Sequence, residues 1–431
     1  MMRTSLTSPL LLLIATAAST LGVTACGDDD ASSPGGTTST ASGGSDGSGA
    51  GAAQGGGDDG GGGGTGGSGP GDTCLEDPNL CGGERPVCAP DGRCVECSAE
   101  DTSLCTGDNA ICDTLAFRCG PCRFHEQCPG AACNVFTGVC MTAPPVVVGP
   151  DPGDDFNSVA AAVAAVPASG EGILRVKEEG GPYEEFFMLD GDRVVAILSE
   201  TGRPVLDASD AVVDQVGTTR PVVSVTGATL MMEGIRARSE DDVAFDVFDA
   251  QMALDRTEIR GSAGLAILAD AVAEVRLRNT IVGGNDTPES AIVLGPDATL
   301  DANFSTIAGG GGAGTFAVRC EPGTKLRLRN AIVFSGSSGP ALGFCATDLM
   351  VAHTAAPEML PGPGNLAFVV SDGLFASRAT GNLRLTASGQ GAFENVGLWQ
   401  DFDPRTDIDG TPRANLVDSS PDLPGAHAGP P

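Results

Sequence analysis

Charged side chains that could carry out chemistry together gather in one short stretch, residues 236–246. It contains Arg236, Arg238, Glu240, Asp241, Asp242 and Asp246. Paired carboxylates can bind Ca²⁺ or act as a general acid and base. The same run is also typical of a solvated turn in an acidic protein. Nothing else in the sequence commits it to catalysis, so we assign no catalytic residue, no metal site and no cofactor.

Cysteine is the other reactive side chain, and the sequence contains 15 of them. Twelve lie within residues 74–140, in three sets of four: Cys74, Cys81, Cys88 and Cys94; Cys97, Cys105, Cys112 and Cys119; Cys122, Cys128, Cys133 and Cys140. Neighbouring sets meet in CxxC pairs, and thiolates in such pairs can bind zinc. However, the spacing between the two CxxC pairs is slightly longer than in common zinc ribbons, and a redox pair would need a βαβ context that is absent.

Disulfides explain these twelve cysteines better than zinc or redox chemistry does. The segment contains too few apolar residues to form a core, so covalent cross-links must hold it together. We expect two disulfides within each set of four, and each set leaves three pairings open.

The overall composition excludes several functions. The 56 acidic residues outnumber the 24 basic ones, and the resulting charge of −32 repels the phosphates of nucleic acids. With three His, one Trp and one Tyr, the chain has little material for histidine-based catalysis or for stacking sugar rings. A chain of 431 residues also exceeds one ordinary domain. We therefore expect several domains and no nucleic-acid partner.

The N-terminus carries the features of an export signal. Arg3 precedes an apolar stretch, residues 10–18, which is too short to span a bilayer as a permanent helix. Small residues then precede Cys26, and this segment resembles the bacterial lipobox, in which the Cys becomes the lipidated first residue. Without Cys26 an even number of Cys remains for pairing. The alternative is an ordinary secretory signal with an incidental Cys.

We therefore expect a signal peptide over residues 1–25 and lipid attachment at Cys26. Gly27 follows the Cys, which by the same resemblance favours export to the outer membrane. The expected product is an outer-membrane lipoprotein, exposed at the cell surface and bound to the membrane through its lipid.

Composition divides the remaining chain into four parts. Residues 26–72 are rich in Gly, Ser and Asp and should form a disordered tether with a reach of about 40 Å. Residues 73–141 contain the Cys-rich modules, and residues 142–152 form a linker. The modules resemble the tandem Cys-rich modules that precede larger domains in predicted surface lipoproteins of delta-proteobacteria such as myxobacteria. Residues 153–431 are rich in Val, Ile, Leu and Ala and form the large domain.

The large domain begins with a pattern typical of a helix and continues with strands. Apolar residues at 156, 159, 163 and 166 have helical spacing, and Pro167 ends the helix. A strand over residues 173–176, a turn over 181–185 and an apolar run over 194–198 follow.

A repeat then dominates residues 235–332. Isoleucines recur in similar contexts at 24, 22, 26 and 25 residues: Ile235, Ile259, Ile281, Ile307 and Ile332. Short alternating strands at this period cannot each bury an apolar face alone, but they can do so when each repeat is one coil of a solenoid. We expect each isoleucine to stack on the isoleucine of the next coil. The Leu pattern of leucine-rich repeats is missing.

Both ends of the large domain resemble those of exported right-handed parallel β-helix proteins with the pectate-lyase-like fold. The start is the helix followed by residues 173–176 and 182–185, and the end is the D-x-D-G-x-x-R segment over residues 407–413, then residues 421–426. The resemblance implies an all-β right-handed solenoid with an N-terminal capping helix. Many such proteins cleave acidic polysaccharides, but the Gly-His-Gly of polygalacturonase-like members is absent. Lyase-like members use Ca²⁺-binding carboxylates with an Arg base, for which residues 236–246 are the candidates.

Three arginines suggest a binding function instead. Arg256, Arg278 and Arg329 each precede a repeat isoleucine by three residues and should form a broken basic stripe along the coils. Such a stripe could hold a carboxylated or sulfated glycan, or it could simply neutralise nearby Asp and Glu. We favour non-catalytic binding or scaffolding at the cell envelope, with a polysaccharide or protein partner along the solenoid. The alternative is a polysaccharide lyase or glycoside hydrolase with an atypical carboxylate site.

The last two cysteines, Cys320 and Cys345, test the repeat directly. They are 25 residues apart and each follows a repeat isoleucine by 13 residues. In register they would lie on adjacent coils about 4.8 Å apart, within reach of a disulfide. The alternative is a stack of two buried free thiols.

Overall fold

The computed structural model describes a defined part of the chain, residues 74–75, 78–98, 101–106, 111–113, 117–208, 221–239, 243–262, 265–284, 289–336, 339–345, 348–401, 403–413 and 419–428. The expected signal peptide, Cys26 and the expected tether lie outside these residues. All described residues belong to one compact unit, residues 67–431. None of the described helices is long and apolar enough to cross a membrane.

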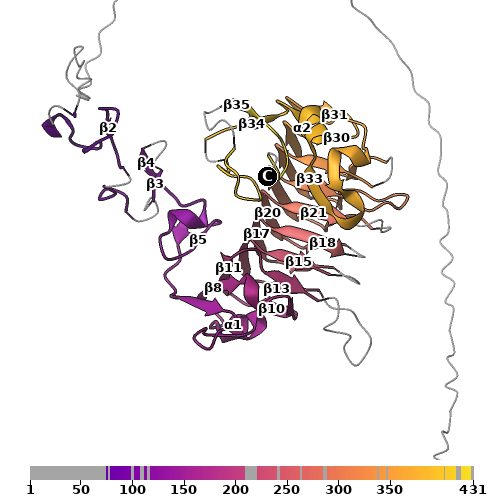
Figure 1. The fold of residues 1–431 in the computed structure, drawn as a ribbon, viewed down its shortest axis with the longest axis horizontal. Coiled ribbons are helices and arrows are strands. Elements are labelled where there is room, and N and C mark those ends of the chain that lie inside the picture. Colours follow the sequence, from indigo (N-terminus) through magenta and orange to yellow (C-terminus); the bar gives the residue numbers. More distant parts are fainter. Residues whose placement is uncertain are drawn as a thin grey trace, which may run out of the picture. The chain divides into compact units, whose positions relative to one another are not determined.

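The large domain is a parallel β-solenoid built from three sheets, here called A, B and C (Figure 1). Sheet A contains β7 (Pro145–Val148), β8 (Glu171–Lys177), β11 (Val194–Thr201), β14 (Thr229–Glu233), β17 (Gln251–Asp255), β20 (Glu274–Arg278), β23 (Thr299–Asn303), β26 (Lys325–Arg329) and β29 (Leu349–Ala352). Sheet B contains β9 (Tyr183–Glu184), β12 (Val205–Asp207), β15 (Arg236–Arg238), β18 (Glu258–Ser262), β21 (Ile281–Gly284), β24 (Thr306–Ala308), β27 (Ile332–Phe334), β30 (Ala355–Ala356) and β31 (Leu366–Ala367). Sheet C contains β10 (Phe187–Asp190), β13 (Val223–Thr226), β16 (Phe245–Phe248), β19 (Ile267–Asp270), β22 (Ile292–Leu294), β25 (Val318–Cys320) and β28 (Leu342–Gly343). The expected fold class, an all-β solenoid preceded by small disulfide-rich modules, is confirmed.

The strands of sheet A show why the sequence folds into coils. In β20 the side chains of Val275 and Leu277 are buried in the solenoid core, while Glu274, Arg276 and Arg278 alternate with them on the outer face. Because side chains alternate between the two faces of a strand, one short segment supplies both a core row and an outer row. Stacking successive coils in parallel register joins these rows into one continuous core.

The stacking of the repeat isoleucines differs from the sequence prediction. Ile259 pairs with Val282, which pairs with Ile307, whereas Ile281 pairs with Thr306, which pairs with Ile332. The expected uninterrupted isoleucine stack is therefore wrong, and isoleucines occupy two neighbouring rows. The Ile259 row belongs to the solenoid core, while Ile281 and Ile332 pack on the C-terminal segment.

Left-handed corners between sheets A and B set the true register of the coils. The residue after each of the five sheet A strands from β14 to β26 has a positive φ: Gly234, Arg256, Asn279, Phe304 and Asn330, with φ of 72°, 47°, 46°, 47° and 53°. Counted from these corners, the repeat isoleucines lie one, three, two, three and two residues downstream. The positions two and three residues after each corner stay in register from coil to coil and lie on opposite faces of sheet B. An isoleucine therefore lies on one face or the other according to which of these two positions it occupies.

The N-terminal cap matches the sequence prediction closely. Helix α1 (Val159–Ala165) begins after Ser158, whose side chain accepts a hydrogen bond from the backbone N–H of Ala161. Val159 and Val163 are buried in the solenoid core. The residues assigned to a linker, 142–152, contain β7, which pairs in parallel with β8. The solenoid sheet therefore begins by residue 145, earlier than the expected start at residue 153.

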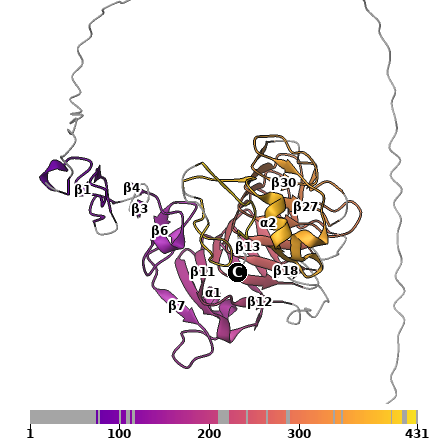
Figure 2. The ribbon, with the colours of Figure 1, turned by 45° about the horizontal axis from the view of Figure 1, so that its top comes forward.

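The C-terminal segment folds back onto the later coils (Figure 2). It contains β32 (Phe375–Ser377), β33 (Asn382–Leu385), α2 (Ala387–Phe393), β34 (Gly397–Trp399) and β35 (Ser420–Asp422), and the short 3-10 helices η4 (Glu178–Gly180), η5 (Asp372–Leu374) and η6 (Arg378–Thr380) complete the domain. Phe375, Leu383 and Phe393 pack against Ile332 and Phe334 of the solenoid. This apolar contact covers the outer face of sheet B in the later coils.

The closing D-x-D-G-x-x-R segment fastens the C-terminal segment to the corners. The carboxylate of Asp407 accepts hydrogen bonds from the backbone N–H groups of Asp409 and Thr411, which forms a tight turn. Arg413 donates to the Asn279 side chain at 2.9 Å. In this protein the D-x-D-G-x-x-R motif therefore has a structural role: it forms a turn and attaches the C-terminal segment to the solenoid.

Each Cys-rich module is a small hairpin held by two disulfides. The hairpins are β1 (Val87–Cys88) with β2 (Cys94–Val95), β3 (Ile111–Asp113) with β4 (Arg118–Gly120), and β5 (Cys133–Asn134) with β6 (Val139–Cys140), and the modules also contain η1 (Pro78–Leu80) and η3 (His125–Gln127). The first Cys of each set bonds to the third and the second to the fourth: Cys74–Cys88, Cys81–Cys94, Cys97–Cys112, Cys105–Cys119, Cys122–Cys133 and Cys128–Cys140.

Candidate functional site

A cleft of about 480 Å³ lies between the third module, residues 122–140, and the outer face of sheet A. His125 and Phe136 line it from the module, and Arg276, Arg278 and Asp301 line it from the sheet. This volume is in the range of ordinary ligand pockets. The cleft is therefore a candidate binding site, beside a second hollow of about 600 Å³ that Phe124, Arg256 and Arg405 help to line.

The outer face of sheet A changes character under the module. One row of paired residues runs Ile173, Ala196, Met231, Ala253, Arg276, Asp301 and Arg327 across successive strands. Ala132 and Met141 pack on Ile173, Ala196 and Met231 at the apolar end of this row. The third module thus covers the apolar half of the row, and Arg276 and Asp301 of the charged half line the cleft.

Two arginines that line the cleft hold the edge of the module. The guanidinium carbon of Arg276 lies 4.5 Å from the centroid of the Phe136 ring, and its Nη1 donates to the carbonyl of Val135 at 2.9 Å. The guanidinium carbon of Arg278 lies 4.0 Å from the centroid of the Phe124 ring, and its Nη1 donates to the carbonyl of Arg123 at 2.8 Å. A guanidinium over an aromatic face is attracted by the negative charge of the ring. These contacts tie the module to the solenoid on one side of the cleft.

The arginine stripe expected from the sequence is only partly formed. Arg278 and Arg329 occupy one outer row, since each pairs with Asn303 on β23 between them. Arg256 lies at a corner, one position away, and lines a neighbouring hollow.

All three arginines are bound to carboxylates. Arg256 contacts Glu233 and Glu126, Arg278 contacts Asp255, and Arg329 contacts Asp403. Their side chains keep 30%, 19% and 30% of their surface exposed. These contacts fit the alternative in which the arginines neutralise neighbouring acids, and they leave part of each guanidinium open to the solvent.

Two carboxyl groups in the cleft have raised pKa values. Burial raises the pKa of Asp255, against the opposing effect of the Arg278 guanidinium. Its Oδ1 is buried and has no hydrogen-bond partner among the described residues. Burial also raises the pKa of Asp301, against the opposing effect of Arg276. Carboxyl groups that bind a proton more readily than usual can donate as well as accept hydrogen bonds.

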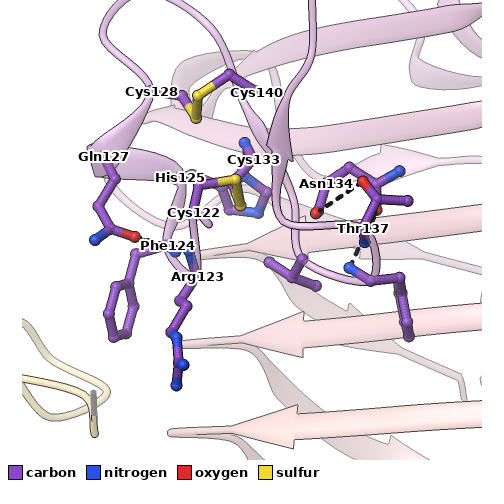
Figure 3. Close-up of a disulfide and its surroundings, with 12 residues drawn as sticks. Cys122, Arg123, Phe124, His125, Gln127, Cys128, Cys133, Asn134, Thr137 and Cys140 are labelled. Atoms are coloured by element: carbon purple, nitrogen blue, oxygen red, sulfur yellow. Dashed lines mark hydrogen bonds between the residues drawn. A yellow bond between two sulfur atoms is a disulfide. The ribbon is translucent and has the colours of Figure 1, made fainter. Parts of the chain in front are cut away.

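His125 lies between the module and sheet A, beside the Cys122–Cys133 disulfide (Figure 3). Its Nδ1 accepts a hydrogen bond from the backbone N–H of Cys133 at 3.1 Å. Its Nε2 lies 4.0 Å from a carboxylate oxygen of Glu233. Burial, with the positive charge of Arg278, lowers the pKa of His125 to about 4. The imidazole is therefore neutral near pH 7 and acts as part of the module's core.

The other sequence candidates lie elsewhere. Glu240, Asp241 and Asp242 lie outside the described residues, and Asp246 lies on β16 in sheet C. Arg236 contacts the buried Glu258 on sheet B. Sequence reasoning missed Asp255, Asp301 and Asp403. A single acidic residue in the alternating strand at 299–303 was the available signal for Asp301.

Comparison with known proteins gives one match. A protein-family model described as a family of unknown function (DUF8331) matches residues 24–146. The match covers the Cys-rich modules and ends within β7, so the solenoid lies almost entirely outside it. The comparison with curated proteins found no match, and neither did the comparison with solved structures.

Proposed function

We propose that this protein is an exported, lipid-anchored envelope protein that binds an extracellular saccharide in the cleft between the third module and sheet A, without cleaving it. The observation that carries this proposal is the change along one outer row, from apolar residues under the module to Arg276 and Asp301 in the open cleft. Such a cleft offers guanidinium donors and carboxyl acceptors beside one another. Saccharide hydroxyls need both.

The size and the edge of the cleft also suit a sugar. Phe136 and Arg276 form a cation–aromatic pair in the cleft lining, and a sugar ring can pack on the exposed part of such a surface. The many acids of the chain disfavour a strongly anionic polymer along the whole face. We therefore infer a ligand that is mainly hydroxylated.

Three observations support the location. The apolar stretch at residues 10–18 and Cys26 resemble a lipoprotein signal, the seven disulfides of the described residues suit an oxidising compartment, and the family match begins at residue 24, two residues before Cys26. We propose that Cys26 carries the lipid and that the protein faces outward from the outer membrane. We also propose kinship with pectate-lyase-like β-helices and with the Cys-rich surface lipoproteins of myxobacteria, on the motifs quoted above.

A glycan array with the purified mature protein tests the binding function. We expect selective binding that Asp301→Asn and Arg276→Ala both weaken. Arg319→Ala is the matched control, because Arg319 pairs with Glu321 two residues away at 3.0 Å, much as Arg276 pairs with Glu274 at 2.7 Å. Arg319 lies in sheet C, away from the cleft residues. The proposal would be refuted if the wild type bound no glycan, or if Arg276→Ala and Asp301→Asn bound as tightly as the Arg319→Ala control.

A second candidate function rests on the raised pKa of Asp301 and Asp255. A carboxyl group that stays protonated at higher pH can act as a general acid in glycoside cleavage. Assays for reducing ends and for unsaturated products on every bound glycan separate the two functions. Turnover that Asp301→Asn abolishes would favour the hydrolase or lyase over the binding protein.

A further inference from the structure

A second cluster of charged residues lies on the outer face of sheet B, around Glu258. The Glu258 side chain is fully buried, and four arginines contact its carboxylate: Arg203, Arg236, Arg260 and Arg384. Arg236 and Arg260 come from neighbouring strands, β15 and β18. Arg203 lies between β11 and β12, and Arg384 comes from β33 in the C-terminal segment. One carboxylate thus gathers guanidinium groups from four separate parts of the chain.

Among the residues that the structure describes, the charges in this cluster do not balance. Four guanidinium groups face two carboxylates, those of Glu258 and Asp409. Arg384 donates to the Asp409 carboxylate at 2.7 Å, and an Arg203 nitrogen lies 3.5 Å from the same carboxylate. The cluster therefore carries an excess of two positive charges, in a chain whose net charge is −32. His427 lies 4.0 Å from Asp409, and burial lowers its pKa, so it adds no charge near pH 7. The adjacent pair Arg238 and Asp207, 3.9 Å apart, is neutral as a pair.

Holding the C-terminal segment in place explains only half of the cluster. Arg384 binds Asp409 and Glu258, and Arg203 donates to the carbonyl of Ile408 at 2.5 Å. These two arginines connect the solenoid with the C-terminal segment. Arg236 and Arg260 lie on strands that the β-ladder already joins. Their two positive charges add electrostatic repulsion and link no further segment.

Arg236 and Arg260 also keep donors that the described residues do not use. Arg236 reaches Glu258 through Nε at 3.2 Å, and no acceptor among the described residues contacts its two Nη groups. Arg260 uses Nε and Nη2 on Glu258, which leaves Nη1 without an acceptor in the same part of the chain. Their side chains are 33% and 23% exposed. Both guanidinium groups are therefore reachable from the solvent and are held in place from behind by Glu258.

We propose that Arg236 and Arg260, with Arg203 and Arg384 behind them, form a binding site for an oxyanion, namely a carboxylate or sulfate group. Guanidinium groups bind such planar or tetrahedral oxyanions through paired N–H donors. Glu258 orients the donors, and the excess charge of the cluster supplies the attraction. The site lies on sheet B, apart from the cleft on sheet A, and does not depend on a ligand in that cleft.

Calorimetric titration of the purified protein with sodium sulfate and with sodium glucuronate tests the proposal, with sodium chloride at equal ionic strength as the reference. We expect saturable binding of at least one oxyanion at one site. Arg236→Gln and Arg260→Gln should each weaken it about tenfold, the loss of one charge-assisted contact. Arg319→Gln should leave binding unchanged, because Arg319 lies in sheet C, where it pairs with Glu321 rather than with Glu258.

Glu258→Gln gives a measurement that a purely structural cluster would not predict. The glutamine oxygen can still accept hydrogen bonds from the guanidinium groups, but the competing negative charge is gone and the net charge of the site rises. Sulfate should therefore bind more tightly and should raise the melting temperature of this variant more than that of the wild type. If Glu258→Gln does not fold, the two arginine variants still decide. No saturable oxyanion binding by the wild type, or undiminished binding by both arginine variants, would overturn the proposal.

Two further comparisons test where the anion comes from and whether the oxyanion site is separate from the cleft. A uronate oligosaccharide that binds more tightly than glucuronate would support an anion carried by a polymer, and equal affinity would support a free anion. Asp301→Asn, a cleft variant, should leave oxyanion binding intact. If it abolished oxyanion binding, the two sites would be one, and the inference of a separate site would fail.

Discussion

Arg413 lies over the ring of Phe304, with its guanidinium carbon 3.8 Å from the centroid of the ring. Phe304 occupies a left-handed corner of the solenoid, and Arg413 is the last residue of the D-x-D-G-x-x-R segment. The guanidinium is fully buried and also contacts Asp422 and the carbonyl of Gly425. One arginine therefore joins the C-terminal segment to a corner of the solenoid.

The first prediction is that Arg413→Ala strongly destabilises the solenoid. Removing the guanidinium leaves Asp422 buried without its partner, and breaking a buried ion pair in this way costs about 3–5 kcal/mol. Urea unfolding followed by tryptophan fluorescence measures the loss, because the only Trp, Trp399, is buried in the same C-terminal segment. Arg319→Ala, which removes an exposed pair, should cost less than about 1 kcal/mol. Equal effects of the two variants would contradict this role for Arg413.

The second prediction concerns the disulfide between Cys320 and Cys345, whose Cα atoms are 4.9 Å apart on adjacent coils. It closes a loop of 25 residues, which in the loop-entropy description contributes roughly 3 kcal/mol. The double variant Cys320→Ser, Cys345→Ser should lower the free energy of unfolding by about this amount. Unfolding of the variant and of the oxidised wild type in urea gives the difference.

A control separates this disulfide from those of the modules. Adding a reductant to the double variant should affect the modules and leave the solenoid transition unchanged. If the double variant unfolds at the same urea concentration as the wild type, the disulfide contributes nothing to the solenoid.

The period of the solenoid could be predicted from the sequence because every coil needs apolar residues at alternating strand positions. The register could not. Ile259 and Ile281 follow their corners, Arg256 and Asn279, by three and two residues, so isoleucines that recur once per coil do not all lie on one face of sheet B. The same shift separates Arg256 from the row of Arg278 and Arg329. A left-handed corner is formed here by Gly, Arg, Asn and Phe, so residue type alone gives little sign of its position.

The cleft could not be predicted because it depends on contact between two parts of the chain with different sequence patterns. The third module carries a cysteine spacing, and sheet A carries an alternating one. Neither pattern predicts that Met141 packs on Met231 or that Phe136 contacts Arg276. The Glu258 cluster has the same origin, since its arginines are up to 181 residues apart in sequence, from Arg203 to Arg384.

The third prediction concerns the anchor. Metabolic labelling with a fatty-acid probe should tag the wild-type protein and should not tag Cys26→Ser. The physical reason is that the lipid attaches through the thiol of this residue, and a hydroxyl does not replace it. Cys320→Ser is a suitable control, because it removes a Cys from the solenoid and should leave labelling intact. An unlipidated mature protein that begins at another residue would contradict the anchor.

The fourth prediction is that acid loosens the third module from the solenoid. The pKa of His125 falls from its usual value near 6.5 to about 4 in the folded protein. Between these two values the unfolded chain binds a proton at His125 and the folded chain does not, so stability is full above about pH 6.5 and decreases as the pH falls toward about 4. The decrease amounts to roughly 3 kcal/mol, because each pKa unit corresponds to 1.36 kcal/mol.

Hydrogen exchange at residues 122–141, measured from pH 7 to pH 4 on the full mature protein, follows this loosening. His125→Gln should flatten the pH dependence of exchange there, since glutamine can still accept the hydrogen bond from Cys133 but does not titrate. His427, which burial also shifts to a lower pKa, lies in the C-terminal segment, so His427→Gln should change the pH dependence of that segment and leave the module's unchanged. If His125→Gln retains the pH dependence of the wild type at the module, protonation of His125 is not what weakens its contact with sheet A.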